Sequence, residues 1–166
     1  EGDFLLSAET LLSKARLSPI PVENGNIKIQ KPEGWSSSID EDGITIFVAD
    51  KAGTEGFRPR IHVFAVKAAS GQAVDQIEWV EKEVGRLAGK AGTFEVRERK
   101  RLHIRAGGSD QEMVTLTRRL DRPVVTLRKM LFRKKNSYFF SAYAHERDYQ
   151  GLESLFKDCM RSLELR

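Results

Sequence analysis

Basic side chains recur at every second position within one short segment of the sequence. The members of this set are Arg97, Arg99, Arg101, His103 and Arg105. Side chains alternate between the two faces of an extended strand, so this spacing predicts a row of cations about 7 Å apart on one face. Guanidinium groups bind carboxylates and phosphates through paired hydrogen bonds. The pattern therefore predicts a surface that docks an anionic partner.

The charge of the surrounding sequence favours the same kind of partner. Residues 94–135 contain 13 Lys and Arg against 5 Asp and Glu, a net charge of +8, whereas the rest contains 15 against 19. The neighbouring predicted strands add Arg119 to the candidate surface, together with Arg118, Arg128, Lys129 and Arg133. Cross-strand pairing with Glu95 and Glu112 is the alternative, in which this is a solvated sheet face.

An aromatic residue is a second candidate for partner contact. Trp79 falls on the polar side of a predicted helix, and an exposed tryptophan is often an interface residue. The alternative is that another segment covers it. A nucleic acid is not expected as the partner, because no aromatic residue alternates with the arginines to stack on bases.

The remaining chemistry-bearing residues do not form a recognisable catalytic or metal site. His62 and His145 lack the spacing of metal ligands and are predicted to be structural. Cys159 lies on the apolar stripe of the last predicted helix, as a small hydrophobic residue would. The sequence has no nucleophile elbow, phosphate loop, dinucleotide fingerprint or zincin motif. We therefore expect a protein that is not an enzyme and that has no metal and no cofactor.

Three segments have apolar residues at the spacing of an amphipathic helix. They span about residues 4–17, 73–88 and 148–165, and Asp148 is the expected N-cap of the last one. The first helix is too short to be stable alone, so it is expected to dock on the body or on a partner.

Two prolines separate the first predicted helix from the rest of the sequence. Pro19 and Pro21 end helix formation, and Val22 to Asn26 are predicted to be a linker. The predicted organisation is an N-terminal amphipathic helix with a proline-containing linker over residues 1–25, followed by a single α+β domain over residues 26–166.

Strand patterns fill the space between the helices. Alternating or β-branched runs predict strands near residues 27–30, 36–40, 44–49, 61–67, 93–104, 112–120, 124–134 and 137–145. Tight turns join several of them, which makes those strands antiparallel. Because the helices do not alternate with the strands, the sequence predicts an α+β fold.

The order of elements and two short motifs resemble the PsbP-like superfamily, which includes Mog-type Ran-binding proteins and bacterial DcrB-like proteins. The motifs are Pro-Glu-Gly-Trp at 32–35 and Arg-Ser-Leu at 161–163. The resemblance implies an α/β/α sandwich with a central, mainly antiparallel sheet flanked by helices. It also implies a bacterial binding or assembly protein without shared catalytic residues, and some members are lipid-anchored or act as chaperones.

The sequence predicts a non-catalytic protein that docks an anionic partner on a basic sheet face, and it leaves alternatives open. A chaperone could bind an apolar segment of its partner through a concave face containing Met130, Phe132, Tyr138 and Phe140, or a homodimer could form there. A small-ligand-binding or enzymatic domain is a further alternative. No run of about 20 apolar residues predicts a transmembrane segment. The cell envelope, reached with a leader since removed, is favoured over the cytoplasm.

Overall fold

The computed structural model of the chain describes residues 16–67, 93–103, 109–119, 122–133 and 136–165. The chain divides into two compact units, which are considered separately. The first contains Glu1–Arg60 and Ala144–Arg166, and the second contains Ile61–Tyr143. The predicted helix over 73–88 lies outside the described residues, as does the predicted helix over 4–17 except for its last two residues. That helix prediction is wrong at its end, because Leu17 begins a strand.

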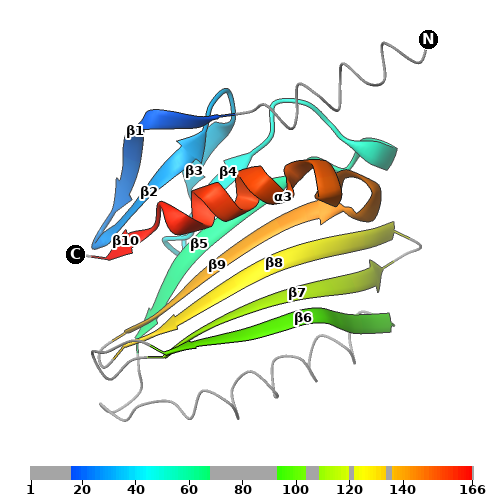
Figure 1. Cartoon of the computed structure of the whole chain (residues 1–166). Coiled ribbons are helices and arrows are strands. Elements are labelled where there is room, and N and C mark those ends of the chain that lie inside the picture. The colour runs from blue at the N-terminus through cyan, green and yellow to red at the C-terminus, as the bar shows by residue number, and fades with distance from the viewer. Residues whose placement is uncertain (1–15, 68–92, 104–108, 120–121, 134–135, 166) are drawn as a thin grey trace. The chain divides into compact units, whose positions relative to one another are not determined.

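A three-stranded antiparallel sheet and one helix form the core of the first unit (Figure 1). The sheet has the order β1-β2-β10, with β1 at Leu17–Asn24, β2 at Ile27–Pro32 and β10 at Glu164–Leu165. The prediction of a linker over residues 22–26 is wrong at its start, because Val22 to Asn24 pair with β2. The two prolines are tolerated because β1 is an edge strand whose register shifts between Leu17 and Pro21.

Helix α3 spans Glu146–Arg161 and contacts β2 and β1. Its apolar stripe is buried, and the ring of Phe156 meets Trp35 edge to face with centroids 6.4 Å apart. The predicted cap is wrong: His145 caps the helix through its side chain, and Asp148 lies inside the first turn. The helix also ends earlier than predicted, since Glu164 and Leu165 belong to β10.

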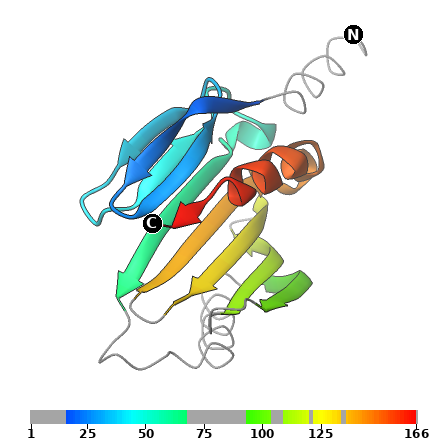
Figure 2. The same cartoon turned by 60° about the vertical axis from the view of Figure 1, so that its left-hand side comes forward.

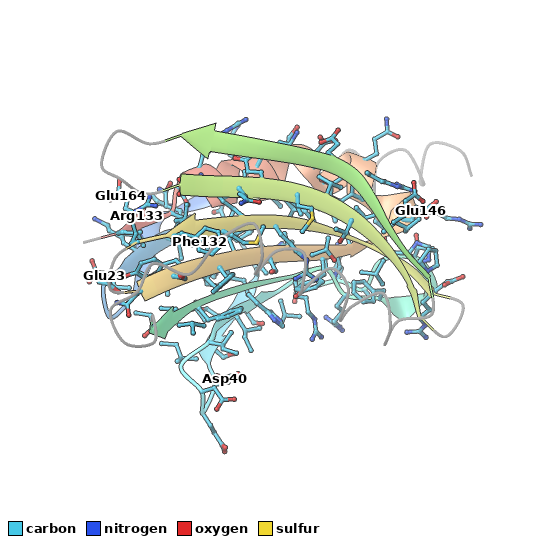
Figure 3. The ribbon with its side chains drawn as sticks, turned by 90° about the horizontal axis from the view of Figure 1, so that it is seen from below. Glu23, Asp40, Phe132, Arg133, Glu146 and Glu164 are labelled. Carbon is cyan, nitrogen blue, oxygen red and sulfur yellow. The ribbon has the colours of Figure 1, made fainter. Side chains whose placement is uncertain are left out.

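A short hairpin and a loop complete the first unit. Strands β3 (Ser36–Ile39) and β4 (Thr45–Val48) pair antiparallel, and Figure 3 shows Asp40 at the tip of this hairpin. Asp40 Oδ1 accepts hydrogen bonds from the N–H groups of Asp42 and Ile44, at 2.9 Å each. The loop that follows β4 contains a single 3-10 turn, η1, at Thr54–Gly56.

The second unit is built from five strands in the order β5-β9-β8-β7-β6 (Figure 2). Their bounds are β5 Arg60–Lys67, β6 Thr93–His103, β7 Ser109–Arg119, β8 Arg122–Phe132 and β9 Asn136–His145. Strand β7 pairs antiparallel with both β6 and β8. The sequence-based strand predictions are confirmed here to within a few residues.

The described part of the chain is therefore an α+β fold of mostly antiparallel strands with one helix, as the sequence predicts. The helix packs on a sheet, which is how an amphipathic helix buries its apolar stripe. The division of the chain at residues 25 and 26 stays a prediction.

Candidate binding surface

Strand β6 carries the predicted row of cations, and its pairing with β7 contains a β-bulge. Val96 lies opposite Thr115 and Glu98 lies opposite Val114, so Arg97 has no opposite residue on β7. A bulge of this kind inserts one extra residue and re-aims the strand at that point. Arg97 is exposed, as are its neighbours Glu95 and Glu98.

The bulge breaks the alternation on which the predicted row depends. Beyond it, Arg99 lies opposite Met113 and Arg101 opposite Gln111 in the backbone register. Before it, Val96 lies opposite Thr115, which is on the same face of β7 as Met113 and Gln111. Residues directly opposite each other share a face of the sheet. The prediction of one unbroken row is therefore wrong at Arg97, and the change of face happens there.

The backbone register pairs positions of opposite charge on the other face of this sheet. The register places Glu112 of β7 between Lys100 of β6 and Lys129 of β8. Such cross-strand pairs stabilise a sheet and keep its face soluble. This is the alternative that the sequence leaves open for Glu112, although its opposite residues are lysines and not arginines.

One of the candidate arginines is already engaged within the unit. Arg133 Nη1 donates to Asp110 Oδ1 at 2.8 Å and to the carbonyl oxygen of Phe132 at 3.1 Å. Asp110 is buried, so this ion pair is screened less than a pair at the surface. Phe132 and Arg133 are both labelled in Figure 3. Arg133 therefore has a structural role: it links the end of β8 to the start of β7.

The remaining predicted site residues lie at the ends of the strands or outside the described part. His103 lies opposite Ser109. Arg119, the last residue of β7, lies opposite Arg122, the first residue of β8. Arg105 and Trp79 fall outside the described residues, so their roles stay predictions.

The apolar face predicted for a chaperone or a homodimer is not open. Met130 and Phe132 belong to a buried cluster with Met113 and Phe139, against which Phe64 packs. The other two predicted members, Tyr138 and Phe140, are buried as well. A residue next to Phe139 on β9 points to the opposite face, so the four predicted residues do not share one surface.

Two buried polar residues that the sequence pattern does not predict lie on strand β7. Gln111 and Thr115 are buried, although both are polar and Gln111 lies between the charged residues Asp110 and Glu112. Buried polar groups nearly always have hydrogen-bond partners. The side-chain oxygens of both, and the buried Nε of Arg128, have none among the residues that the structure describes.

The predictions that His145 and Cys159 have structural roles agree with their contacts. His145 Nδ1 accepts a hydrogen bond from the N–H of Arg147, and its Nε2 lies 3.1 Å from Glu55 Oε2. Because Nδ1 is the acceptor, Nε2 carries the proton and donates to the carboxylate. Cys159 Sγ donates to the carbonyl oxygen of Gln30 at 3.3 Å. Burial raises the pKa of the Cys159 thiol far above its ordinary range, so the thiol is unreactive.

Two further features are absent from the described part of the chain. It contains no helix long and apolar enough to cross a membrane. It also contains no group of three or more His, Cys, Asp or Glu residues placed to hold a metal ion.

Solved structures with the same arrangement of elements identify the fold. Cyanobacterial PsbP (CyanoP) from Synechocystis has a TM-score of 0.66 at 11% identity, covering 92% of this chain and 94% of that chain. The Ran-binding protein Mog1 from Saccharomyces cerevisiae has a TM-score of 0.63 at 10% identity, with coverages of 92% and 96%. The chain has the PsbP/Mog1-like fold.

A third PsbP/Mog1-like structure is LpqN, which is involved in cell envelope biogenesis of Mycobacterium tuberculosis. It has a TM-score of 0.65 at 12% identity and covers 93% of this chain and 94% of that chain. No family model and no curated protein sequence matches the chain. The fold confirms the resemblance drawn from the element order and the Pro-Glu-Gly-Trp motif.

Proposed function

We propose that this protein is a non-catalytic binding protein that docks a negatively charged partner protein along strand β6. The observation that carries the proposal is the exposed Arg97 at a bulge of β6, within the most basic segment of the chain. Strand β6 is the last strand in the described sheet order, and bulges at sheet edges commonly re-aim side chains. The Ran-binding role of Mog1 is an instance of this fold used to bind a protein.

The mechanism would begin with long-range attraction between opposite charges. The net charge of +8 over residues 94–135 would steer an acidic surface toward β6 and raise the association rate. Arg97 would then pair with a carboxylate of the partner. Glu95 and Glu98, which flank the bulge, would set the register by repelling acidic groups placed opposite them.

The test is the salt dependence of binding to a purified partner. Affinity capture at low salt supplies the partner, and calorimetry then compares the affinity between about 0.05 M and 0.5 M salt. We expect at least a tenfold loss over this range, and a similar loss for the Arg97→Glu variant. The matched control is Arg161→Glu, which reverses an exposed arginine on α3 and should bind normally. An affinity that does not change with salt would contradict the proposal.

A further inference from the structure

Strand β3 has an edge that no other strand of the described residues covers. It stands at the end of its sheet order, and β4 pairs with it on one side. All four residues of β3 are exposed. The strand contains neither Lys nor Pro and pairs with β4 without a bulge. Apart from its short length, it therefore has none of the features that usually protect an open strand edge.

The hydrogen bonds of the hairpin fix which backbone groups face this edge. The N–H of Asp40 donates to the carbonyl oxygen of Ile44 at 3.0 Å, so these opposite residues form a hydrogen-bonded pair. Such pairs alternate along an antiparallel ladder, which makes Ser38 the next residue bonded to β4. The N–H and C=O groups of Ser37 and Ile39 therefore point to the open edge, and no described residue bonds to them.

The open edge is bounded at both ends. Trp35 precedes Ser37 in the alternation, but its carbonyl oxygen accepts a hydrogen bond from Lys31 Nζ at 2.6 Å. At the other end, a turn begins at Asp40, whose carbonyl oxygen accepts the N–H of Gly43 at 3.1 Å. The edge therefore suits a short extended segment.

One face of β3 offers apolar contact beside the open edge. Phe47 and Thr45 of β4 are 0% exposed, and they lie opposite Ser37 and Ile39. Opposite residues share a face of the sheet, so Ile39 continues the buried face of β4, and yet it is 52% exposed. An apolar side chain on an added strand would cover Ile39, and the small side chain of Ser37 leaves room for a second one.

The charge near the edge favours a basic occupant. Residues 34–50 contain four Asp and Glu and no Lys or Arg. Glu41 and Asp42 are exposed just beyond β3, and neither forms an ion pair with a residue that the structure describes. Asp40 has another role, because its Oδ1 accepts the N–H groups of Asp42 and Ile44 within the turn. Acidic groups beside an open edge attract a segment that carries Lys or Arg.

We propose that the edge of β3 binds an extended segment of a partner protein, in which basic residues precede apolar ones. The segment adds to β3 as an antiparallel strand, and backbone hydrogen bonds to Ser37 and Ile39 supply the affinity. Its N-terminal basic residues then lie toward Glu41 and Asp42, and its apolar residues lie opposite Ile39 and Ser37. This site is separate from the proposed docking along β6, and either can be correct without the other.

The first experiment tests the backbone pairing with the full chain and synthetic peptides. The probe is Lys-Lys-Thr-Val-Thr-Val, whose valines would lie opposite Ile39 and Ser37. Methylation of both valine amides removes the N–H groups that face β3, so calorimetry should show binding at least tenfold weaker. Methylation of both threonine amides is the matched control, because these groups face away, and it should leave the affinity unchanged. Equal affinities of the two methylated peptides, or no binding of the unmethylated probe, would overturn the proposal.

The second experiment tests the preference for a basic segment. A peptide with Glu in place of both lysines should bind at least tenfold more weakly than the probe at low salt. A protein variant that carries both Glu41→Lys and Asp42→Lys should reverse this preference. An unchanged preference in that variant would show that these carboxylates do not select the segment, which contradicts the proposal.

The third experiment assigns the site to its edge. Ser37→Pro removes an N–H that faces outward and keeps the bonds between β3 and β4, so this variant should melt as the wild type does. It should bind the probe at least tenfold more weakly, whereas Ser37→Thr keeps the N–H and should bind normally. Normal binding by Ser37→Pro would overturn the site. A wild-type dimer that Ser37→Pro dissociates in sedimentation would place a second copy at the edge and would overturn the basic partner.

Discussion

At the scale of single residues, the start of α3 holds a distant loop in place. Asp148 accepts hydrogen bonds from the backbone N–H of Thr54 at 2.7 Å and from its hydroxyl at 2.6 Å. Glu55 has a left-handed backbone (φ 55°), and its carboxylate accepts a hydrogen bond from His145 Nε2. Polar groups at the first turn of one helix thus fix the conformation of η1, 94 positions away in the sequence.

Removal of the Asp148 carboxylate tests this arrangement. The Asp148→Ala variant should lose about 2 kcal/mol of stability, because two hydrogen bonds to a charged acceptor disappear. Asp158→Ala is the matched control on the same helix, since its carboxylate is exposed and lies 3.6 Å from Arg161. The control should change stability by no more than about 0.5 kcal/mol. Urea denaturation measures both, and equal losses would show that Asp148 does not hold the loop.

Two glycines of the first unit should respond in opposite directions to alanine. A Cβ at Gly53 would collide with the Asp148 carboxylate, whereas a Cβ at Gly151 meets nothing within 4 Å. Gly53→Ala should therefore destabilise the protein. Gly151→Ala, in the interior of α3, should stabilise it by about 0.5–1 kcal/mol. Thermal unfolding of the pair checks both signs, and a tolerated Gly53→Ala would contradict the close approach.

At the scale of elements, the bulge in β6 decides which residues share a face. The pairing is regular on both sides of Arg97, so this residue is the only one that the described register does not place opposite β7. A single inserted residue exchanges the faces of everything that follows it. The basic segment therefore depends on one position for its geometry.

Deletion of the bulge residue Arg97 can be compared with deletion of a paired residue, Arg99, to test the register. Without Arg97, Val96 and Glu98 keep their partners Thr115 and Val114, so stability should change by no more than about 1 kcal/mol. Deletion of Arg99 instead places Glu98 opposite Met113 and Arg97 opposite Val114, so two cross-strand pairs change and the loss of stability should be larger than on deletion of Arg97. Thermal unfolding compares the two variants. A larger loss on deletion of Arg97 than of Arg99 would contradict the register.

The sequence predicts the strands well but does not predict the β-bulge that interrupts the pairing of β6. Alternation and turn residues locate the strands of the second unit, because burial on one face imposes a period of two. The bulge leaves no such signal, since Arg97 itself continues the alternating pattern. The burial of Gln111 and Thr115 is not predicted either, because it depends on packing that no local pattern records. His145 as a cap is missed because Asp148 has the stronger local preference.

At the scale of the whole molecule, the buried thiol makes stability depend on pH. The folded state keeps the Cys159 proton, because burial raises the pKa of the thiol, whereas the unfolded chain releases it above its ordinary pKa of 9.0. The contribution of the protonated thiol to the free energy of unfolding is therefore fully present below about pH 9 and is lost as the pH rises above that value. Above that pH, the free energy of unfolding falls by up to about 1.4 kcal/mol per pH unit for the one proton released.

A comparison with Cys159→Ala isolates that contribution. The variant should be less stable than the wild type at pH 7, because a buried side chain is truncated. The difference should narrow between about pH 9 and 10.5, since only the wild type releases a thiol proton on unfolding. Urea denaturation at several pH values measures the difference. A constant difference over this range would show that the thiol ionises in the folded state.

Strand β10 gives the first unit a consequence for its synthesis on the ribosome. Gln30 of β2 donates its N–H to Ser162 Oγ, 132 positions later, and Glu164 and Leu165 complete the sheet beside Ile27 and Lys28. While the nascent chain is growing, one edge of β2 has no neighbour until residues 162–165 have been made and have left the ribosome. An exposed strand edge invites pairing with other chains. This edge therefore stays open to such pairing during the synthesis of the more than 120 residues that separate β2 from β10.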